Sequence, residues 1–283
     1  MRRLQIYHET LYELTSVVQL GLHQLIIRPR EGHDLRIESW RLEISPRHRI
    51  KWHRDAHDNS VASVTFNEPT QLLKVASTVV IQHFDEAPLD FLVADYAVQY
   101  PFSYTADDLA ILAPYLEPTD AQAGGPLRTW LTGFWLPGIR IQTYVLLESL
   151  CRGIANGLNY RVREEPGVQS PSQTLSSGGG SCRDFAAMFM EAARALGLAA
   201  RFVSGYLHGA EAGMGATHAW AEVYLPGAGW KGFDPTIGKL TGSDHIPVAV
   251  ARRPEAVPPV AGTFTGPSGA SARMLVTVNV LSL

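Results

Sequence analysis

The first 82 residues form a series of short segments in which apolar and polar residues alternate, or in which β-branched and aromatic residues are concentrated. Turn-forming clusters of Pro, Gly, Asn, Asp and Ser separate most of these segments, and no long helical pattern begins before about residue 106. Such spacing is typical of antiparallel sandwiches and half-barrels. We therefore expect an antiparallel β-sandwich-like domain over 1–105. Its candidate strands are Leu4–Leu14, Val17–Ile27, Leu35–Ile44, Ile50–His53, Val61–Phe66 and Leu72–Ile81.

The pattern changes after residue 105. Short helical turns interrupted by Pro114 and Pro118 occupy residues 106–138, which we interpret as a linker. We place a second domain at 139–283, and this domain includes a Pro/Gly-rich C-terminal segment and a closing strand at 274–283. Because none of the chemically interesting residues lies before this domain, we expect the N-terminal domain to be a separate structural unit.

Helical spacing of apolar residues predicts helices in the second domain, the first over 140–154. Residues 163–180 are rich in Gly, Ser and Pro and predict a surface loop. Ser181 followed by Asp184 is a capping-box pattern that starts a helix of about four turns, and Gly197 is placed for a left-handed C-terminal cap. The strands expected after this helix are 200–206, 218–225 and 230–234. The fold class is therefore α+β.

Composition narrows the possible functions. With 46% hydrophobic and 18% charged residues, the chain is an ordinary globular protein. A net charge of -3 argues against binding to nucleic acid or anionic lipid, and we find no run of about 18 apolar residues that could span a membrane and no signal-peptide pattern. Two cysteines are too few for a disulfide framework or a structural zinc site, so we expect a cytoplasmic protein.

Cys182 occupies the first turn of its predicted helix. Unsatisfied backbone N–H groups and the positive end of the helix dipole favour thiolate over thiol there. The glycines at 178–180 leave the backbone unobstructed, and the Cys182 N–H can donate to an oxyanion on an attacked carbonyl. The alternative is a small core residue, because free cysteine is often buried. On position alone, both interpretations stay open.

His218 and Asp234 are candidates to form a catalytic pair. His218 opens the alternating segment HAWAEVYL, and Asp234 ends the next strand after a Pro/Gly-rich turn. If that turn spans three residues, 226–228, Trp220 lies opposite Asp234 and His218 is its diagonal neighbour; a four-residue turn would place Asp234 on the other face. Taken singly, His218 could be a strand histidine and Asp234 a turn residue.

Three stretches carry a resemblance to a known family: GVQSP, GSCRDFAAMFMEAARALGLAARFVSGYL and THAWAEVYLPGAGWKGFDPT. They resemble the core of the bacterial transglutaminase-like superfamily, a papain-related fold in which a nucleophile helix packs on an antiparallel sheet, over about residues 140–240. The β-rich first half resembles the N-terminal region that accompanies this core. The resemblance implies that Cys182 is the nucleophile, His218 the general base and acid, and Asp234 the residue that orients the histidine.

The same resemblance suggests further residues that support catalysis. Tyr160 and Gln169 are the candidates to complete an oxyanion hole. Trp220, Gly180 and Ser181 are candidates for the substrate cleft, although Trp220 is better explained as packing beside the imidazole and excluding water. Gln169 is equally explained as a solvated loop residue.

The sequence therefore predicts a cysteine-dependent amide-bond hydrolase, an amidase or peptidase that acts on a peptide or protein amide through a thioester and needs no cofactor. The alternatives are acyl transfer from a protein glutamine to an amine, which uses the same thioester, and a non-catalytic peptide-binding scaffold. Hydrolysis is preferred because no amine-binding feature is identified.

Other candidate sites are weaker. His48, His53 and His57 are four or five residues apart, but in a strand-turn region this spacing does not converge on a metal ion, so we expect solvated histidines and no metal site. Cys151 lies on the apolar stripe of its predicted helix and is expected in the core. Asp184 is best explained as a helix cap.

Overall fold

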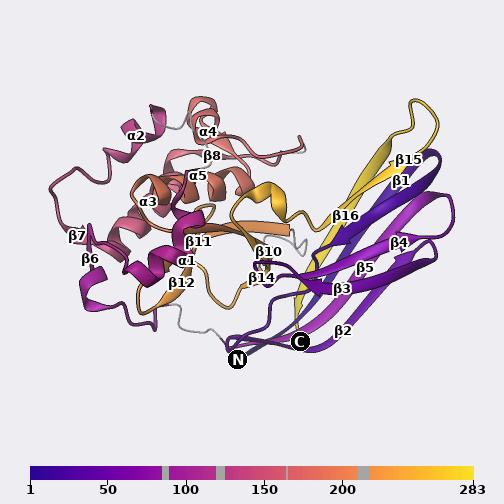
Figure 1. Cartoon of the computed structure of the whole chain (residues 1–283), viewed down its shortest axis with the longest axis horizontal. Helices are drawn as coiled ribbons and strands as arrows, with labels where there is room; N and C mark the ends of the chain where they lie inside the picture. The colour runs from indigo at the N-terminus through magenta and orange to yellow at the C-terminus, as the bar shows by residue number, and fades with distance from the viewer. Residues whose placement is uncertain (85–88, 119–124, 164, 210–216) are drawn as a thin grey trace.

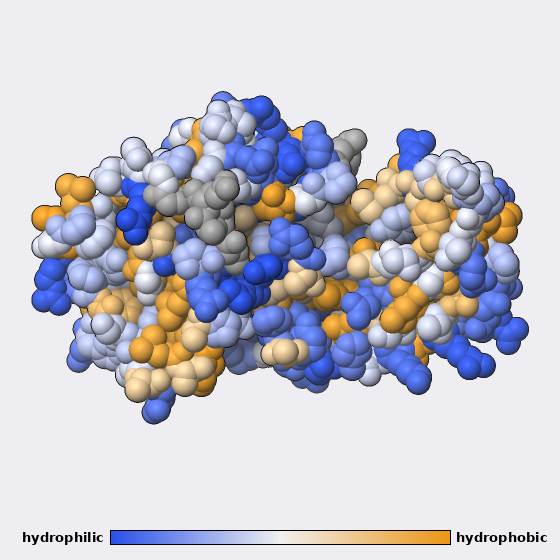
Figure 2. All heavy atoms as spheres, turned by 45° about the horizontal axis from the view of Figure 1, so that its top comes forward, coloured by the Kyte–Doolittle hydropathy of each residue, from blue (hydrophilic) through white to orange (hydrophobic). Residues whose placement is uncertain are grey.

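The structure is a computed structural model that describes residues 1–84, 89–118, 125–163, 165–209 and 217–283. A β-sandwich-like region lies beside a region in which helices pack on a second sheet (Figure 1), which confirms the expected α+β class. Figure 2 shows hydrophilic and hydrophobic residues interspersed over both regions of the face that it presents. Among the described residues, none of the helices has the length and apolar character needed to cross a membrane.

The N-terminal strands pair antiparallel in the order β2-β5-β1-β4-β3. The two segments expected at 4–14 and 17–27 form one strand of 24 residues, so the expected division was wrong. The first half of this strand pairs with β5 and its second half with β4, and the register shifts between Glu13 and Val18. The strands are β1 (Arg2–Leu25), β2 (Leu35–Ser45), β3 (His48–Arg54), β4 (Ser60–Phe66) and β5 (Thr70–His83).

The C-terminal strands belong to this same sheet. β15 (Val260–Thr265) and β16 (Ala272–Ser282) both pair antiparallel with β1. We expected the closing strand in the 139–283 domain, and that assignment was wrong. The long β1 offers unpaired backbone groups along its edge, and a returning strand satisfies them.

The second sheet has the order β13-β12-β11-β10-β14 and is antiparallel. Helix α5 (Cys182–Ala195) packs on it through aromatic side chains, and the Phe189 ring stacks on Phe233 with centroids 5.3 Å apart. Helix α3 (Thr143–Gly157) packs against both α5 and β12. The strands are β10 (Ala200–Leu207), β11 (Thr217–Leu225), β12 (Gly229–Asp234), β13 (Lys239–Leu240) and β14 (His245–Ala251).

Two segments contain more regular secondary structure than their composition indicates. The expected linker contains α1 (Ala106–Leu116) and α2 (Pro126–Leu131), whose Leu112 and Leu127 are buried, so it is part of the packed structure. The expected surface loop contains α4 (Pro171–Ser177), which begins with a capping box between Ser170 and Gln173. Short elements complete the fold: η1 (Asp95–Ala97), β6 (Gln99–Tyr100), β7 (Ile141–Gln142), β8 (Asn159–Tyr160), β9 (Gly179–Gly180) and η3 (Pro254–Ala256).

The two regions share a buried interface. Leu4 and Ile81 of the N-terminal sheet belong to the same hydrophobic cluster as Ile246 of the second sheet. His8 Nδ1 is 2.7 Å from the Tyr206 hydroxyl, and both residues are buried. The amide of Asn59 donates to the Val250 carbonyl at 2.8 Å and accepts from the Val250 N–H at 2.9 Å. The N-terminal region is therefore joined to the core by apolar packing and paired polar groups.

This shared core predicts that the chain unfolds in a single thermal transition. Apolar contacts across the interface couple the two regions, because neither can expose its part of the cluster without a loss of packing in the other. Scanning calorimetry with coincident circular dichroism would measure this. Two resolved transitions, or two stable halves released by cleavage between residues 105 and 135, would instead support the separate unit expected from the sequence.

Candidate active site

The N-terminus of α5 positions the candidate nucleophile. Asp184 accepts hydrogen bonds from the Ser181 N–H at 2.8 Å and from the Ser181 hydroxyl at 2.9 Å, so the predicted cap is confirmed. Asp184 is fully buried, and its carboxylate lies at the positive end of the helix dipole. Cys182 is consequently fixed as the first residue of α5, partly exposed to solvent.

Asp184 also holds the preceding chain. Its carboxylate accepts from the Gln169 N–H at 2.8 Å and from the Arg163 guanidinium at 2.8 and 2.9 Å. Burial alone would raise the pKa of Asp184, but the hydrogen bonds from Gln169, Ser181 and Arg163 outweigh it and hold the pKa below its ordinary value. Arg163 was missed, since a single arginine in a Gly/Ser-rich segment gives no pattern.

The glycines before Cys182 permit close packing. Gly178 has φ of 64° and ends α4 in the left-handed region. Gly180 lies beside the cap, and a Cβ at this position would come within 2.7 Å of Asp184 Cβ and 3.0 Å of its carboxylate. Gly180 is buried in β9, so its place in the fold is explained by this packing.

Gly180→Ala is expected to displace Asp184 and hence the start of α5. Overpacking of a filled site costs about 1–3 kcal/mol, and the shift should lower the reactivity of Cys182 as well as the melting temperature. Alkylation rates and thermal melts of the variant would measure both effects. Gly157→Ala is the matched control, because nothing lies within 4 Å of a Cβ there. Wild-type behaviour of Gly180→Ala would contradict the packing argument.

The β11–β12 hairpin has the register that the pairing of His218 with Asp234 requires. Leu225 pairs with Gly229 and Ala221 with Phe233, so the connecting turn spans three residues. The same register, continued by one pair, places Asp234 opposite Trp220. The sequence-based condition for a catalytic pair is therefore met.

The three candidate catalytic side chains lie together. His218 Nε2 is 2.7 Å from Asp234 Oδ2, and the Cys182 side chain is close enough to the His218 ring to act on its pKa. Burial alone would lower the pKa of His218, but hydrogen bonds and charges from Asp234 and Cys182 raise it to about 10. Burial would raise the pKa of Asp234, yet hydrogen bonds from two histidines hold it well below its ordinary value. The site favours a protonated imidazole beside the Asp234 carboxylate.

The second histidine on Asp234 is His245, which sequence reasoning missed. Its Nε2 lies 3.0 Å from Asp234 Oδ2, and the other carboxylate oxygen accepts from the Thr236 N–H at 2.9 Å. His245 is the first residue of the apolar strand β14, and His218 is the second residue of β11. This position was the only available signal, and it does not show which carboxylate the ring meets.

His218, Asp234 and His245 also lie close enough together to hold a metal ion, since their possible ligand atoms are all within 4.8 Å of one another. Within the described ranges, no other group of three or more His, Cys, Asp or Glu residues does so. However, the Gly242 N–H donates to His245 Nδ1 at 3.3 Å. A histidine that binds a metal through Nε2 carries its hydrogen on Nδ1 and donates from it, so two donors would face each other. The geometry favours hydrogen bonding over metal binding.

The histidines at 48, 53 and 57 do not form a common site. His48 Nδ1 is 3.0 Å from the Pro46 carbonyl, and His53 is exposed. His57 differs from the solvated histidine expected, since its Nδ1 is 2.9 Å from the Tyr115 hydroxyl. His57 therefore connects the N-terminal region to α1 through this hydrogen bond.

The two oxyanion candidates differ in position. Tyr160 in β8 pairs with Gly180, and the charges of Cys182 and Asp234 contribute, after burial, to raising the pKa of Tyr160. Its side chain is half-exposed. The Gln169 side chain instead accepts from the Thr174 hydroxyl at 3.2 Å, while its backbone binds Asp184. The pKa of Tyr160 thus responds to the catalytic groups, whereas the Gln169 side chain is hydrogen-bonded to Thr174.

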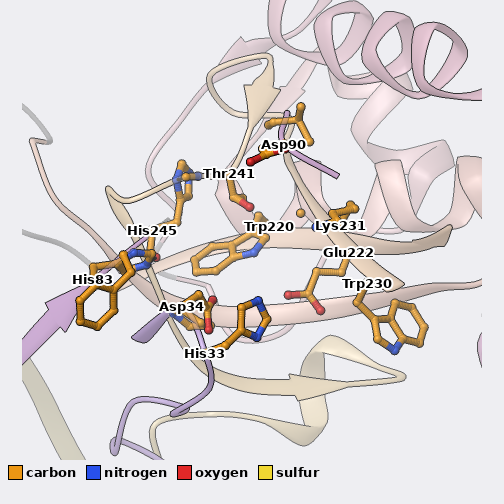
Figure 3. Close-up of a pocket in the computed structure, with 15 residues that line it drawn as sticks. His33, Asp34, His83, Asp90, Trp220, Glu222, Trp230, Lys231, Thr241 and His245 are labelled. Atoms are coloured by element: carbon orange, nitrogen blue, oxygen red, sulfur yellow. Dashed lines mark hydrogen bonds between the residues drawn. The ribbon is translucent and has the colours of Figure 1, made fainter. Parts of the chain in front are cut away.

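The remaining cleft candidates are largely buried. The Ser181 hydroxyl is bonded to Asp184, and Trp220 is 2% exposed, with its ring centroid 6.2 Å from that of His218 and 5.3 Å from that of His245. Trp220 also borders a cavity of about 360 Å³ between the N-terminal region and the second sheet (Figure 3). The lining residues that Figure 3 labels are His33, Asp34, His83, Asp90, Trp220, Glu222, Trp230, Lys231, Thr241 and His245. The cavity adjoins the catalytic chain at His245.

Cys151 is fully buried in α3, as expected. Its thiol lies 3.7 Å from the Lys239 carbonyl, and burial raises its pKa. Both cysteines are free thiols. Cys151 therefore provides an internal comparison for the reactivity of Cys182.

Comparison with known proteins agrees with this architecture. Residues 143–235 match the transglutaminase-like superfamily, and residues 4–82 match the bacterial transglutaminase-like N-terminal region. The resemblance found in the sequence is thereby confirmed for both halves.

Relatives and a solved structure extend over nearly the whole chain. An uncharacterized protein of Mycobacterium tuberculosis is 28% identical over 281 residues, which cover 92% of this chain and 87% of the relative. One of Mycobacterium leprae is 24% identical over 293 residues and covers 100% of both chains. A Cytophaga hutchinsonii protein provisionally named a cysteine protease has a TM-score of 0.75 and 19% identity, covering 100% of this chain and 91% of its own. This last similarity shows a common fold.

Proposed function

The chain belongs to the transglutaminase-like superfamily, and on that premise we propose that it is a cysteine-dependent amide hydrolase, an amidase or peptidase that acts on a peptide or protein amide. The observation that carries the proposal is that Cys182, at the N-terminus of α5, lies beside a buried histidine that is hydrogen-bonded to Asp234. A nucleophile, a base and an orienting carboxylate are the parts that covalent acyl transfer requires.

The proposed reaction has two stages. The Cys182 thiolate attacks the amide carbon, and we assign the stabilisation of the oxyanion to the Cys182 N–H and the Tyr160 hydroxyl. The His218 imidazolium gives its proton to the leaving amine, and a thioester remains. Neutral His218 then removes a proton from water, which attacks the thioester and releases the acid and the thiolate. Asp234 keeps the imidazole oriented in both stages.

Two neighbouring functions remain as outcomes of the test. Transfer of the acyl group to an amine would use the same thioester with a different acceptor. A non-catalytic scaffold would not require Cys182, His218 and Asp234 to lie together. We also propose a reducing, cytoplasmic compartment, since the nucleophile must stay a free thiol.

Iodoacetamide labelling near neutral pH, read by peptide mass spectrometry, tests the proposal. We expect Cys182 to be alkylated at least about tenfold faster than Cys151, because a thiolate and not a thiol attacks the reagent. Cys151 serves as a control within the same molecule. Equal, slow labelling of both cysteines would support the scaffold. Turnover of an amide library with and without added amines would then distinguish hydrolysis from acyl transfer.

A further inference from the structure

We propose that His245 is a positioning residue for the catalytic carboxylate: its Nε2–H holds Asp234 Oδ2 where His218 Nε2–H can reach it. This inference rests on the proposed function, and it adds a fourth side chain to the three that the sequence indicates. It is carried by the directions of the hydrogen bonds around the two buried rings.

The tautomer of His245 follows from its neighbours. A backbone N–H can only donate, so His245 Nδ1, which receives the Gly242 N–H at 3.3 Å, must be an acceptor. The hydrogen of the neutral ring is therefore on Nε2, and it points at Asp234 Oδ2, 3.0 Å away. The backbone at Gly242 thus prevents this imidazole from presenting a lone pair to the carboxylate.

The carboxylate has little freedom once these bonds are made. Asp234 is fully buried, the Thr236 N–H holds Oδ1, and both histidines meet Oδ2. Because the three donors come from different places in the chain, rotation of the carboxylate would break at least one buried hydrogen bond. Unpaired buried acceptors are costly, so His245 restricts Asp234 to the orientation that serves His218.

His245 is itself fixed from the N-terminal region. His83 Nε2 in β5 lies 3.1 Å from the His245 backbone carbonyl, and the His245 side chain is 5% exposed. Among the described residues, Asp234 and His218 face the ring, and His83 meets the His245 backbone carbonyl. The adjoining cavity is also lined by five titratable side chains: His33, Asp34, Asp90, Glu222 and Lys231 (Figure 3). The N-terminal sheet thereby contributes to the active site although it supplies none of the three catalytic residues.

Two amide substitutions separate the roles of the ring nitrogens. In His245→Asn the amide oxygen can replace Nδ1 as acceptor from Gly242, but the side chain is too short to reach Asp234. In His245→Gln the amide nitrogen can approximate Nε2 and donate to Asp234. His8→Asn is the matched control, because His8 is an equally buried histidine that bonds Tyr206 instead of the catalytic chain.

The pH profile of Cys182 alkylation in the full-length chain is the closing measurement, with turnover measured beside it. We expect His245→Asn to lower kcat/KM on the order of 10- to 100-fold and to move the acidic limb of alkylation to higher pH, since a poorly placed Asp234 stabilises the imidazolium–thiolate pair less. His245→Gln should restore most of the activity and the wild-type limb, and His8→Asn should leave the limb unchanged.

The outcomes distinguish this proposal from the one on which it rests. If wild-type Cys182 shows no excess reactivity over Cys151, the proposed function fails and His245 has no catalytic pair to position. If wild-type Cys182 reacts as expected but His245→Asn has the wild-type limb, the positioning role alone is overturned. A limb that moves equally in His8→Asn, or a glutamine variant as impaired as the asparagine variant, would also overturn it. Should the asparagine variant not fold, His245→Leu replaces it in the same comparison.

Discussion

Cys182→Ala should abolish amide hydrolysis while the protein remains folded. The substitution removes the proposed nucleophile, and loss of a triad nucleophile costs on the order of 10⁶ in kcat for a well-studied serine enzyme. Stability should change little, because the side chain is partly exposed and alanine is compatible with the first turn of α5. Turnover of a peptide and amide library, together with thermal melts, would measure both effects.

Two further variants make this result specific. Cys182→Ser should be almost as inactive, because a hydroxyl ionises far less readily than a thiol at the same helix N-terminus. Cys151→Ala should keep its activity, since Cys151 is buried in the core and its thiol contacts the Lys239 carbonyl. Substantial hydrolysis by Cys182→Ala, in preparations freed of other proteases, would remove the nucleophile from the proposed mechanism.

Asp234→Asn is expected to lower kcat by about 10- to 10³-fold. The amide keeps the size of the side chain but replaces one acceptor oxygen with a donor, which opposes the two histidine N–H groups. The loss should be smaller than the roughly 10⁴-fold loss seen for the aspartate of a serine triad, because a thiolate–imidazolium pair can persist without its third member.

The pH dependence of this variant has a defined sign. Asp234 and Cys182 together raise the pKa of His218 from 6.5 to about 10 against the opposing effect of burial. Without the carboxylate that pKa falls, so the imidazolium is lost at lower pH and the alkaline limb of the pH–rate profile moves downward. Linked stability follows the same rule: the stabilisation is complete below the unfolded pKa of 6.5 and is lost as pH rises through about 10. An asparagine variant with wild-type rate and profile would show that Asp234 is only a turn residue.

The sequence by itself determined the local features. The cap formed by Ser181 and Asp184 depends on groups three residues apart, so the start of α5 and the placement of Cys182 could be predicted from a short pattern. The shared face of His218 and Asp234 depends only on the period of a strand and the length of one turn. Each of these features is fixed by a few adjacent backbone groups, and a pattern in sequence records them.

Only the tertiary structure decided which distant groups meet. The alternation in 274–283 predicts a strand but is equally compatible with either sheet, and the edge of β1 selects it. The sequence left open whether the Gln169 side chain faces the cleft, and in the structure this side chain accepts a hydrogen bond from the Thr174 hydroxyl. His245 gained its role because β14 returns beside β10 and brings the ring to Asp234 from beyond the hairpin. Pairing, packing and desolvation between remote segments are properties of the folded chain, and no local spacing encodes them.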